Sequence, residues 1–401
     1  MLFEADRHEA PSGAPWEAQV VARAIRGLGD DFESALDAGG HWPAHALDLE
    51  GEQARPFHSL YLGAAGVLWA LWHLERAGAV ELRIAPDALI RRAYDDYLAA
   101  PDTGAVVPSY YLGEVGILLV RWRLTGDAAA AERLYTLIRD NIPNPTNEAL
   151  WAAPGTMVGA LHMLEWTGDE RWRSLFLDNV EQLWKTWLPS PYLDGHLWTQ
   201  DLYGSIVQLL GAGHGYAGNV YPLLRGAALM PAERRDALLQ RCADLLGRTA
   251  LRDGDGVNWP PGVGPTRPGR ASVLVQWCHG APGIVTATAD FPRGVSAAMD
   301  RLLLDAGATI WRAGPLVKGY GLCHGTAGNG YAFLKLYRRT GDANWLARAR
   351  AFAMHALGQR ERMRARYGVG RYSLWTGDAG LAVYLQDCID GTDRMPGLDR
   401  L

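Results

Sequence analysis

The sequence predicts an all-α fold, an α/α toroid (barrel) of about seven helical hairpins that form an inner and an outer ring of helices. A motif of the form G-x-x-G, followed by an apolar run, recurs seven times along the chain. The intervals between copies leave room for two helices and two loops, and no long stretch alternates between polar and apolar residues as a half-buried strand would. These observations together predict a nearly all-helical repeat protein.

The motif marks the start of the first helix of each hairpin. Its leading positions are Gly63, Gly113, Ala152, Gly215, Gly280, Gly325 and Gly377. Only the third copy has lost its leading glycine, which is replaced by Ala152. The apolar run after each motif indicates a buried inner helix, and the paired small residues allow that helix to begin close against its neighbour.

The second helix of a hairpin also has a marker. Thr-Gly-Asp recurs at Thr125, Thr167 and Thr340, each time before a helix-forming stretch. Glycine is typical of the end of one helix, and aspartate caps the start of the next. The stretches after Asp127 and Asn344 have helical spacing with charged outer faces, which predicts half-exposed outer helices.

We expect one toroid domain over residues 1–401, with the repeats at about 59–385 and a helical or irregular N-terminal segment at 1–58. The longer loops at 187–213 and 251–275 are rich in Pro, Gly and Trp and are expected to cover one face of the ring. An open solenoid is disfavoured because no polar capping helix is evident at either end of the array.

Composition excludes several classes of protein. Lys and Arg number 39 against 44 Asp and Glu, so the basic excess typical of nucleic-acid binders is missing. No apolar run approaches the 18 to 20 residues, approximately, that span a bilayer, and no secretory signal precedes residue 16. The 4 cysteines are too few for a disulfide scaffold in a chain this long, which favours a cytoplasmic location.

Candidate functional residues stand just before the motifs. Inner helices of such a ring all run the same way, so the seven motifs are predicted to lie on one rim. The residue before the motif is histidine in copies four to six: His214, His279 and His324. The residue before that is cysteine in copies five and six, Cys278 and Cys323. Because these copies are neighbours, their side chains are expected to converge at one end of the central cavity.

Two Cys-His-Gly tripeptides in equivalent repeat positions indicate a metal site, because thiolate and imidazole are the ligands that Zn(II) selects. The candidate ligands are Cys278, His279, Cys323 and His324. Four protein ligands would make a closed structural site, whereas three would leave the open position of a catalytic zinc. Two thiolates and one neutral histidine give a neutral centre that can accept a further thiolate, which predicts thiol chemistry.

The other cysteines and histidines are interpreted as structural. Cys242 and Cys388 are expected to be inert buried residues. Histidines near apolar helices are expected to be hydrogen-bonded core residues: His73, His162 and His355. The remainder are expected in loops or on the surface: His8, His41, His45, His58 and His196.

Several strings in the chain resemble the lanthionine synthetase C-like family. They are WCHGAPG (277–283), KGYGLCHGTAGN (318–329), NWPPGVG (258–264), HGYAG (214–218) and SLYLGAAG (59–66). Members of that family form α/α toroids with one zinc at the rim, and the resemblance covers about 59–385. It is closer to the stand-alone, eukaryotic-type branch than to the bacterial lantibiotic cyclases, because of His279, the Asn-Trp-Pro-Pro turn and the Lys-Gly-Tyr-Gly before Leu322.

The resemblance implies roles for individual residues. It implies Cys278, Cys323 and His324 as ligands of one Zn(II), and His214 as the acid/base catalyst, with His279 as the alternative proton donor. In the stand-alone branch, a lysine and an arginine that match Lys318 and Arg371 help to bind glutathione.

Further positions match the family less completely. Glu148 stands where the cyclases carry an aspartate, and it is a candidate substrate-binding carboxylate. Leu274 replaces an arginine of the cyclases, which weakens the cyclase interpretation. Trp277 is expected either to line the cavity towards the substrate or to pack in the core.

The function implied is zinc-dependent addition of a small thiol, glutathione or a similar compound, to dehydroalanine or dehydrobutyrine residues of a peptide or protein. The product is a thioether. Two alternatives stay open: a lanthipeptide cyclase that forms intramolecular (methyl)lanthionine rings, and a non-catalytic, zinc-containing scaffold that binds glutathione.

Overall fold

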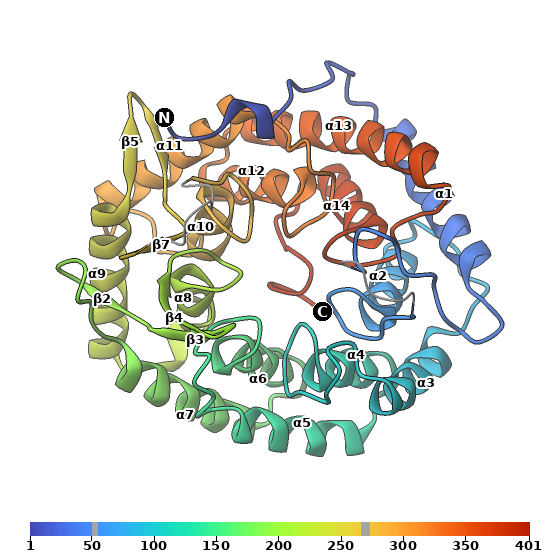
Figure 1. Cartoon of the computed structure of the whole chain (residues 1–401), viewed down its shortest axis with the longest axis horizontal. Helices are drawn as coiled ribbons and strands as arrows, with labels where there is room; N and C mark the ends of the chain where they lie inside the picture. The colour runs from blue at the N-terminus through green and yellow to red at the C-terminus, as the bar shows by residue number, and fades with distance from the viewer. Residues whose placement is uncertain (50–54, 266–272) are drawn as a thin grey trace.

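The protein forms two concentric rings of helices, as a computed structural model describing residues 1–49, 55–265 and 273–401 shows (Figure 1). The inner ring consists of α2 (Ala64–Arg76), α4 (Glu114–Thr125), α6 (Ala153–Thr167), α8 (Tyr216–Arg225), α10 (Ala281–Thr288), α12 (Thr326–Thr340) and α14 (Asp378–Asp390). The outer ring consists of α1 (Ala18–Ala35), α3 (Pro86–Ala99), α5 (Ala128–Asp140), α7 (Glu170–Thr186), α9 (Ala232–Thr249), α11 (Ala297–Ala313) and α13 (Ala343–Tyr367). The predicted all-α toroid is confirmed.

Each inner helix begins directly after the leading residue of a motif. Gly63 is the N-cap of α2, Gly280 that of α10 and Gly325 that of α12, and the other four copies follow the same rule. Among the described helices, those of the inner ring therefore all start at the repeat motifs. We call the side of the ring that carries these N-termini the motif rim.

The second small residue of each motif is needed for close packing. A Cβ atom at Gly328 would lie 1.7 Å from the carbonyl oxygen of Leu322, in the loop before the same helix. A Cβ at Gly66 would lie 2.2 Å from the Leu60 oxygen and 2.7 Å from Cβ of Leu374 in the last repeat. The glycine thus lets the loop fold back on its own helix and lets neighbouring inner helices approach.

The N-terminal segment contributes to the ring. Its helix α1 is the outer partner of α14, and α14 also packs against α2, so the first and last repeats meet. Val21, Ile25, Leu28 and Phe32 form the buried face of α1. Burial of this apolar stripe closes the toroid between its ends.

The Thr-Gly-Asp markers act as predicted at the helix junctions. Gly126, Gly168 and Gly341 end their helices in the left-handed conformation, with φ of 67°, 67° and 74°. The following aspartates cap the next helix, each side chain accepting a backbone N–H at 2.9 Å: Asp127, Asp169 and Asp342. Each marker therefore reverses the chain between the inner and the outer ring.

The two longer loops contain short antiparallel strands. They are β1 (Leu188–Pro189), β2 (His196–Leu197), β3 (Gln200–Leu202), β4 (Ser205–Leu209), β5 (Leu251–Asp253), β6 (Gly256–Asn258) and β7 (Gly262–Val263). They pair as β1-β2, β3-β4-β7 and β5-β6, so β4 joins the first loop to the second. The part of the second loop at 266–272 lies outside the described residues.

The C-terminal segment 391–401 runs into the centre of the ring (Figure 1). Lys335 of α12 is 4% exposed and pairs with Asp393 at 3.3 Å and with Asp399 at 3.0 Å. Tyr221 of α8 donates its hydroxyl to Asp399 at 3.0 Å, and Arg225 donates to the Leu398 carbonyl at 2.7 Å. These anchors lie in the later parts of their helices, away from the motif rim.

The described residues also form two single-turn 3-10 helices, at Ala5–Arg7 and Ala227–Leu229. Among the described residues, no helix has the length and apolar character that crossing a bilayer requires.

Candidate metal and acid–base site

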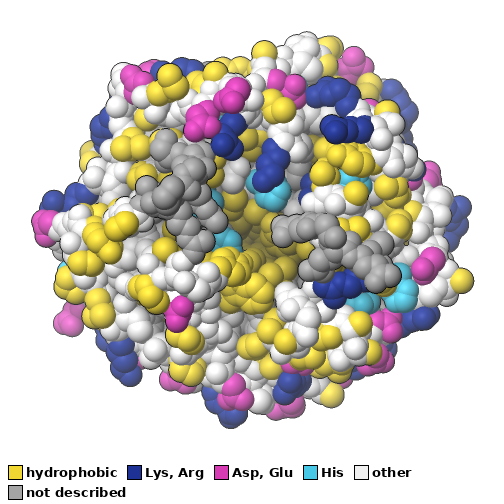
Figure 2. Space-filling model, in the orientation of Figure 1, with side chains coloured by type: hydrophobic (Ala, Val, Ile, Leu, Met, Phe, Trp, Pro, Cys, Tyr) yellow, Lys and Arg dark blue, Asp and Glu magenta, His cyan; other side chains and the backbone are white. Residues whose placement is uncertain are grey.

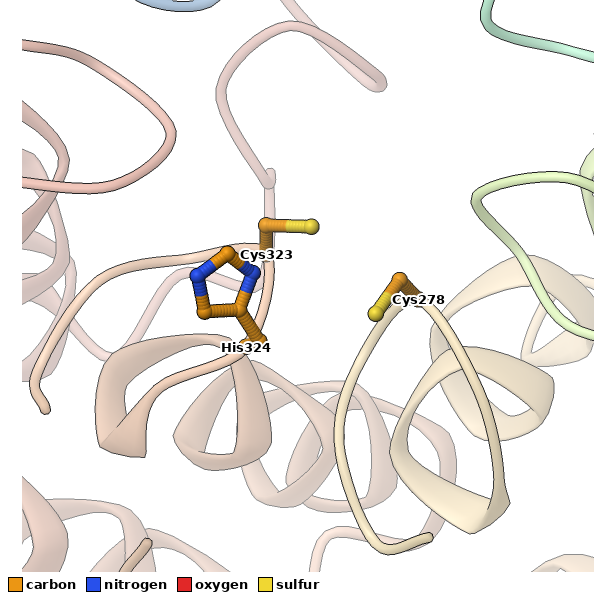
Figure 3. Close-up of side chains that lie close together, drawn as sticks. All are labelled: Cys278, Cys323 and His324. Atoms are coloured by element: carbon orange, nitrogen blue, oxygen red, sulfur yellow. The ribbon is translucent and has the colours of Figure 1, made fainter. Parts of the chain in front are cut away.

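The loops before α10 and α12 bring three candidate ligands together at the motif rim. Cys278 lies in the first loop, and Cys323 and His324 lie in the second, with their side chains in one space (Figure 3). One ligand atom from each of the three lies within 4.8 Å of the others. The convergence expected from the repeat alignment is therefore present for these three residues.

The geometry and chemistry of this group fit zinc. Zn–S bonds of about 2.3 Å and Zn–N bonds of about 2.0–2.1 Å place tetrahedral ligand atoms about 3.5–4 Å apart. The three ligand atoms, which lie within 4.8 Å of one another, are about 1 Å or less from that spacing. Two sulfurs and one imidazole form a donor set that zinc prefers over harder cations. Three protein ligands leave one tetrahedral position for another group.

Hydrogen bonds favour a thiolate at Cys323. The contact from the Cys278 thiol, together with His324 and Tyr61, holds the pKa of Cys323 well below its usual range against the opposing effect of burial. The same contact and burial raise the pKa of Cys278, which acts as the donor. The amide of Gln276 points at the Cys278 sulfur at 2.9 Å, which helps that sulfur carry negative charge.

Backbone hydrogen bonds link the motif loops around the rim. Gly213 N–H donates to the Cys278 carbonyl at 3.2 Å, and Cys278 N–H donates to the Cys323 carbonyl at 3.1 Å. The series continues in one direction through Trp375, Tyr61 and Tyr111. All six residues occupy the same position relative to their motifs. We call these six residues, with the hydrogen bonds that join them, the rim belt.

His214 is held by a buried carboxylate. Its Nδ1 lies 2.9 Å from Oε2 of Glu148, whose side chain is 0% exposed. Glu148 also accepts the backbone N–H groups of Leu150 at 2.9 Å and Trp151 at 2.7 Å. In the structure, all of these partners of Glu148 belong to the protein, and its role as a substrate-binding carboxylate stays a prediction.

This histidine lies beside the candidate ligands. Gly213, the residue before it, belongs to the rim belt, and a Cβ there would lie 3.0 Å from Cβ of Cys278. The rings of His214 and His279 are 6.2 Å apart between centroids. His279 is half-buried and is not one of the three ligands grouped together. The metal-ligand group and the acid–base candidate therefore lie next to each other.

The family model for Lanthionine synthetase C-like protein matches residues 57–399. The chain belongs to this family. A relative from Danio rerio named glutathione S-transferase LANCL1 is 34% identical over 194 residues, which are 48% of this chain and 44% of that protein. LanC-like protein GCL1 from Arabidopsis thaliana is 33% identical over 199 residues, 47% of this chain and 43% of that protein. The chain thus matches less than half the length of these curated relatives.

A solved structure of nisin cyclase has the same fold. The comparison gives a TM-score of 0.65 at 16% identity and covers 92% of this chain and 94% of that one. At this identity, the similarity establishes the toroid alone.

Aromatic side chains of the motif loops form a cluster beside the site in this lanthionine synthetase C-like protein. Trp375 stacks on Tyr61 with a centroid separation of 5.8 Å and contacts Trp277 at 4.5 Å and Tyr111 at 5.1 Å. Tyr111 and Trp277 also line a small cavity of about 10 Å³, with Leu398 of the C-terminal segment. Figure 2 shows a hydrophobic hollow at the centre of the molecule, with histidine at its edge. Trp277 thus both packs and lines the cavity.

Lys318 and Arg371 are the two basic residues predicted to bind glutathione, and of these only Lys318 is exposed to solvent. It is exposed, and its charge favours the thiolate form of Cys278, so it lies within electrostatic range of the site. Arg371 is 7% exposed and forms a two-pronged ion pair with Asp48, with Nε 2.9 Å from the carboxylate. Asp48 lies in the N-terminal segment, and no sequence motif predicted its contact with Arg371.

The remaining cysteines and histidines have structural surroundings. Cys242 and Cys388 are buried, and burial raises the pKa of each thiol. His162 contacts Arg225, His355 pairs with Glu9, and His73 stacks on Trp69. His45 and His58 lie in loops as expected, but each is only 2% exposed; the ring of His45 packs against Tyr367 of α13, and that of His58 against His41.

Proposed function

We propose that this protein adds a small thiol, glutathione or a similar compound, to dehydroalanine or dehydrobutyrine residues of a peptide or protein, forming a thioether. The observation that carries the proposal is the placement of a Cys-Cys-His group beside a histidine held by a buried carboxylate. The name of the Danio rerio relative supports glutathione as the thiol.

The three ligands would hold one Zn(II), which when bound would keep an incoming thiol in its thiolate form. The sulfur then forms a bond to the β-carbon of the dehydroamino acid while the carbon–carbon π bond breaks. His214 delivers a proton to the α-carbon, and the proton released by the thiol restores the imidazolium through solvent. Glu148 stabilises the ring orientation and the charged form of His214 throughout. His279 is the alternative donor, at a ring separation of 6.2 Å.

Other residues would contact the two substrates. Lys318 is placed to attract a carboxylate of glutathione because its charge is exposed near Cys278. Arg371 would contribute when a ligand carboxylate takes the place of Asp48. Trp277 would line the acceptor side of the cavity. We place the reaction in the cytoplasm, where thiols stay reduced; the 4 cysteines are free and buried.

The test is incubation of the zinc-loaded protein with a dehydroalanine peptide and a panel of thiols, followed by mass spectrometry. We expect a mass increase equal to one thiol per dehydroalanine, and we expect His214→Ala to lose turnover while it keeps its metal. Ring formation without an added thiol, in a peptide that also contains cysteine, would replace the proposal with a cyclase. A zinc protein that adds no thiol to any acceptor would be a scaffold.

A further inference from the structure

Backbone strain gathers around the Glu148–His214 pair. Among the described residues, the non-glycine residues with positive φ are Asn147, at 52°, and Tyr203, at 51°. Asn147 precedes Glu148, and Tyr203 contacts His214. Asparagine tolerates this conformation, whereas a bulky aromatic residue there is an outlier. Strain of this kind persists where surrounding structure holds it, often at functional sites.

Tyr203 stands in a tight turn that its side chain does not favour. Leu202 pairs with Ser205, so Tyr203 and Gly204 form the two-residue connection between β3 and β4. Both have positive φ, 51° and 71°, which is the pattern of a type I′ turn. Asn-Gly and Asp-Gly are the preferred sequences for this turn, so the sequence here departs from the stable choice.

The tyrosine ring is held against the catalytic candidate. Its centroid lies 6.0 Å from that of His214 in an edge-on arrangement. Its hydroxyl accepts a hydrogen bond from Nε1 of Trp151 at 3.0 Å, and Trp151 in turn donates its backbone N–H to Glu148. Tyr203 is 65% exposed, so burial of apolar surface does not explain the conformation.

The hairpin is fastened to the loop that carries Glu148. The backbone N–H of Asp201 donates to the Pro145 carbonyl at 3.4 Å, and the Asn147 side chain donates to the Thr199 carbonyl at 3.3 Å. Two connected segments therefore hold His214. The ring of Tyr203 contacts its imidazole, and the carboxylate of Glu148 bonds to its Nδ1.

We propose that Tyr203 is a positioning residue for His214. The turn keeps an unfavourable residue because the phenol ring limits the orientations of the imidazole that Glu148 leaves open. The kinetic part of this proposal rests on the proposed function; the placement of His214 does not.

The experiment compares Tyr203→Asn with Tyr203→Phe and with Ile206→Asn, a control on β4 of the same hairpin at a residue that is 70% exposed. Tyr203→Asn creates the preferred turn, so we expect its thermal midpoint to rise by about 1 °C. We expect its kcat to fall about tenfold or more, with a smaller change in the KM for thiol, because His214 loses its orientation. Tyr203→Phe keeps the ring and should stay within about threefold of wild type.

A readout independent of turnover is the rate at which diethyl pyrocarbonate modifies His214, followed by peptide mass spectrometry. We expect the rate to rise several-fold in Tyr203→Asn and to stay at the wild-type value in Ile206→Asn. Tyr203→Gly also relieves the turn and replaces Tyr203→Asn if that variant folds poorly.

If Tyr203→Asn keeps both the kcat and the His214 modification rate of the wild type, the proposal is overturned. If the thermal midpoint of Tyr203→Asn is lower than that of the wild type, the strain argument is overturned. If the wild-type protein adds no thiol at all, the proposed function fails, while the modification rates and the thermal midpoints still decide the role of Tyr203.

Discussion

Replacing Glu148 by glutamine tests the support of His214 most directly. The carboxylate is completely buried and accepts three hydrogen bonds, from Leu150 N–H, Trp151 N–H and Nδ1 of His214. Glutamine has one oxygen and one NH₂ group. If the oxygen stays with Leu150 and His214, the NH₂ group faces the N–H of Trp151, donor against donor.

One buried N–H is then left without an acceptor, which costs about 1–3 kcal/mol. For a chain of this size, that corresponds to a decrease in the thermal midpoint of about 1–3 °C. The imidazole also loses its negative partner, and loss of such a supporting group lowers activity about 10–100-fold. We therefore expect both a modest loss of stability and a large loss of kcat.

The assay combines thermal unfolding, zinc content and the rate of thiol addition. Glu114→Gln is the matched control, because Glu114 is also buried and bonds to Tyr94 and Arg133 away from His214. The control should lose stability and keep its turnover. Unchanged kcat in Glu148→Gln, or an equal loss of kcat in both variants, would refute the assignment.

Three further predictions concern the metal, the centre of the ring and pH. Cys323→Ala should lose its zinc by elemental analysis, whereas Cys388→Ala, a matched change at a buried free cysteine, should keep it; full zinc in both would contradict the ligand assignment. Lys335→Met should lower the free energy of unfolding by about 3–5 kcal/mol in denaturant titration, because two partly buried carboxylates lose their buried cation; a change below about 1 kcal/mol would contradict this. Burial and nearby arginines lower the pKa of His73 from 6.5 to about 3, so unfolding, which frees this residue to take up a proton, should become easier as pH falls below about 6.5. His73→Gln should show a weaker decrease in thermal midpoint between pH 7 and pH 5, and an unchanged decrease would argue against this role.

The repeat alignment predicted the toroid and the rim because identical local motifs produce identical local structure. Knowing that Cys278 and Cys323 precede equivalent glycines was enough to expect them on adjacent loops of one rim. The Thr-Gly-Asp junctions were predictable for the same reason, since both capping interactions are local.

Features that depend on distant partners escaped prediction. The strands β1 to β7 contain two to five residues, too few for a periodic signal, and they form because the loops pair with each other. The ion pair of Arg371 with Asp48 joins the last repeat to the N-terminal segment, and no local pattern connects them. Glu148 was noticed only by its position, because its partner His214 lies in another repeat. Tyr203 could have been noticed from the sequence, because an aromatic residue stands before Gly204 where a two-residue turn prefers asparagine.

The rim belt links the spacing of the two sulfurs to six of the seven repeats. Cys278 and Cys323 are joined through main-chain atoms, and the rim belt continues to Tyr61 and Tyr111 in the loops before α2 and α4. A cation bound by both cysteines would oppose the separation of these repeats. By thermodynamic linkage, a rim belt with weaker hydrogen bonds would bind that cation less tightly. Metal affinity would then depend on the packing of repeats in the rim belt that contain none of the three ligands.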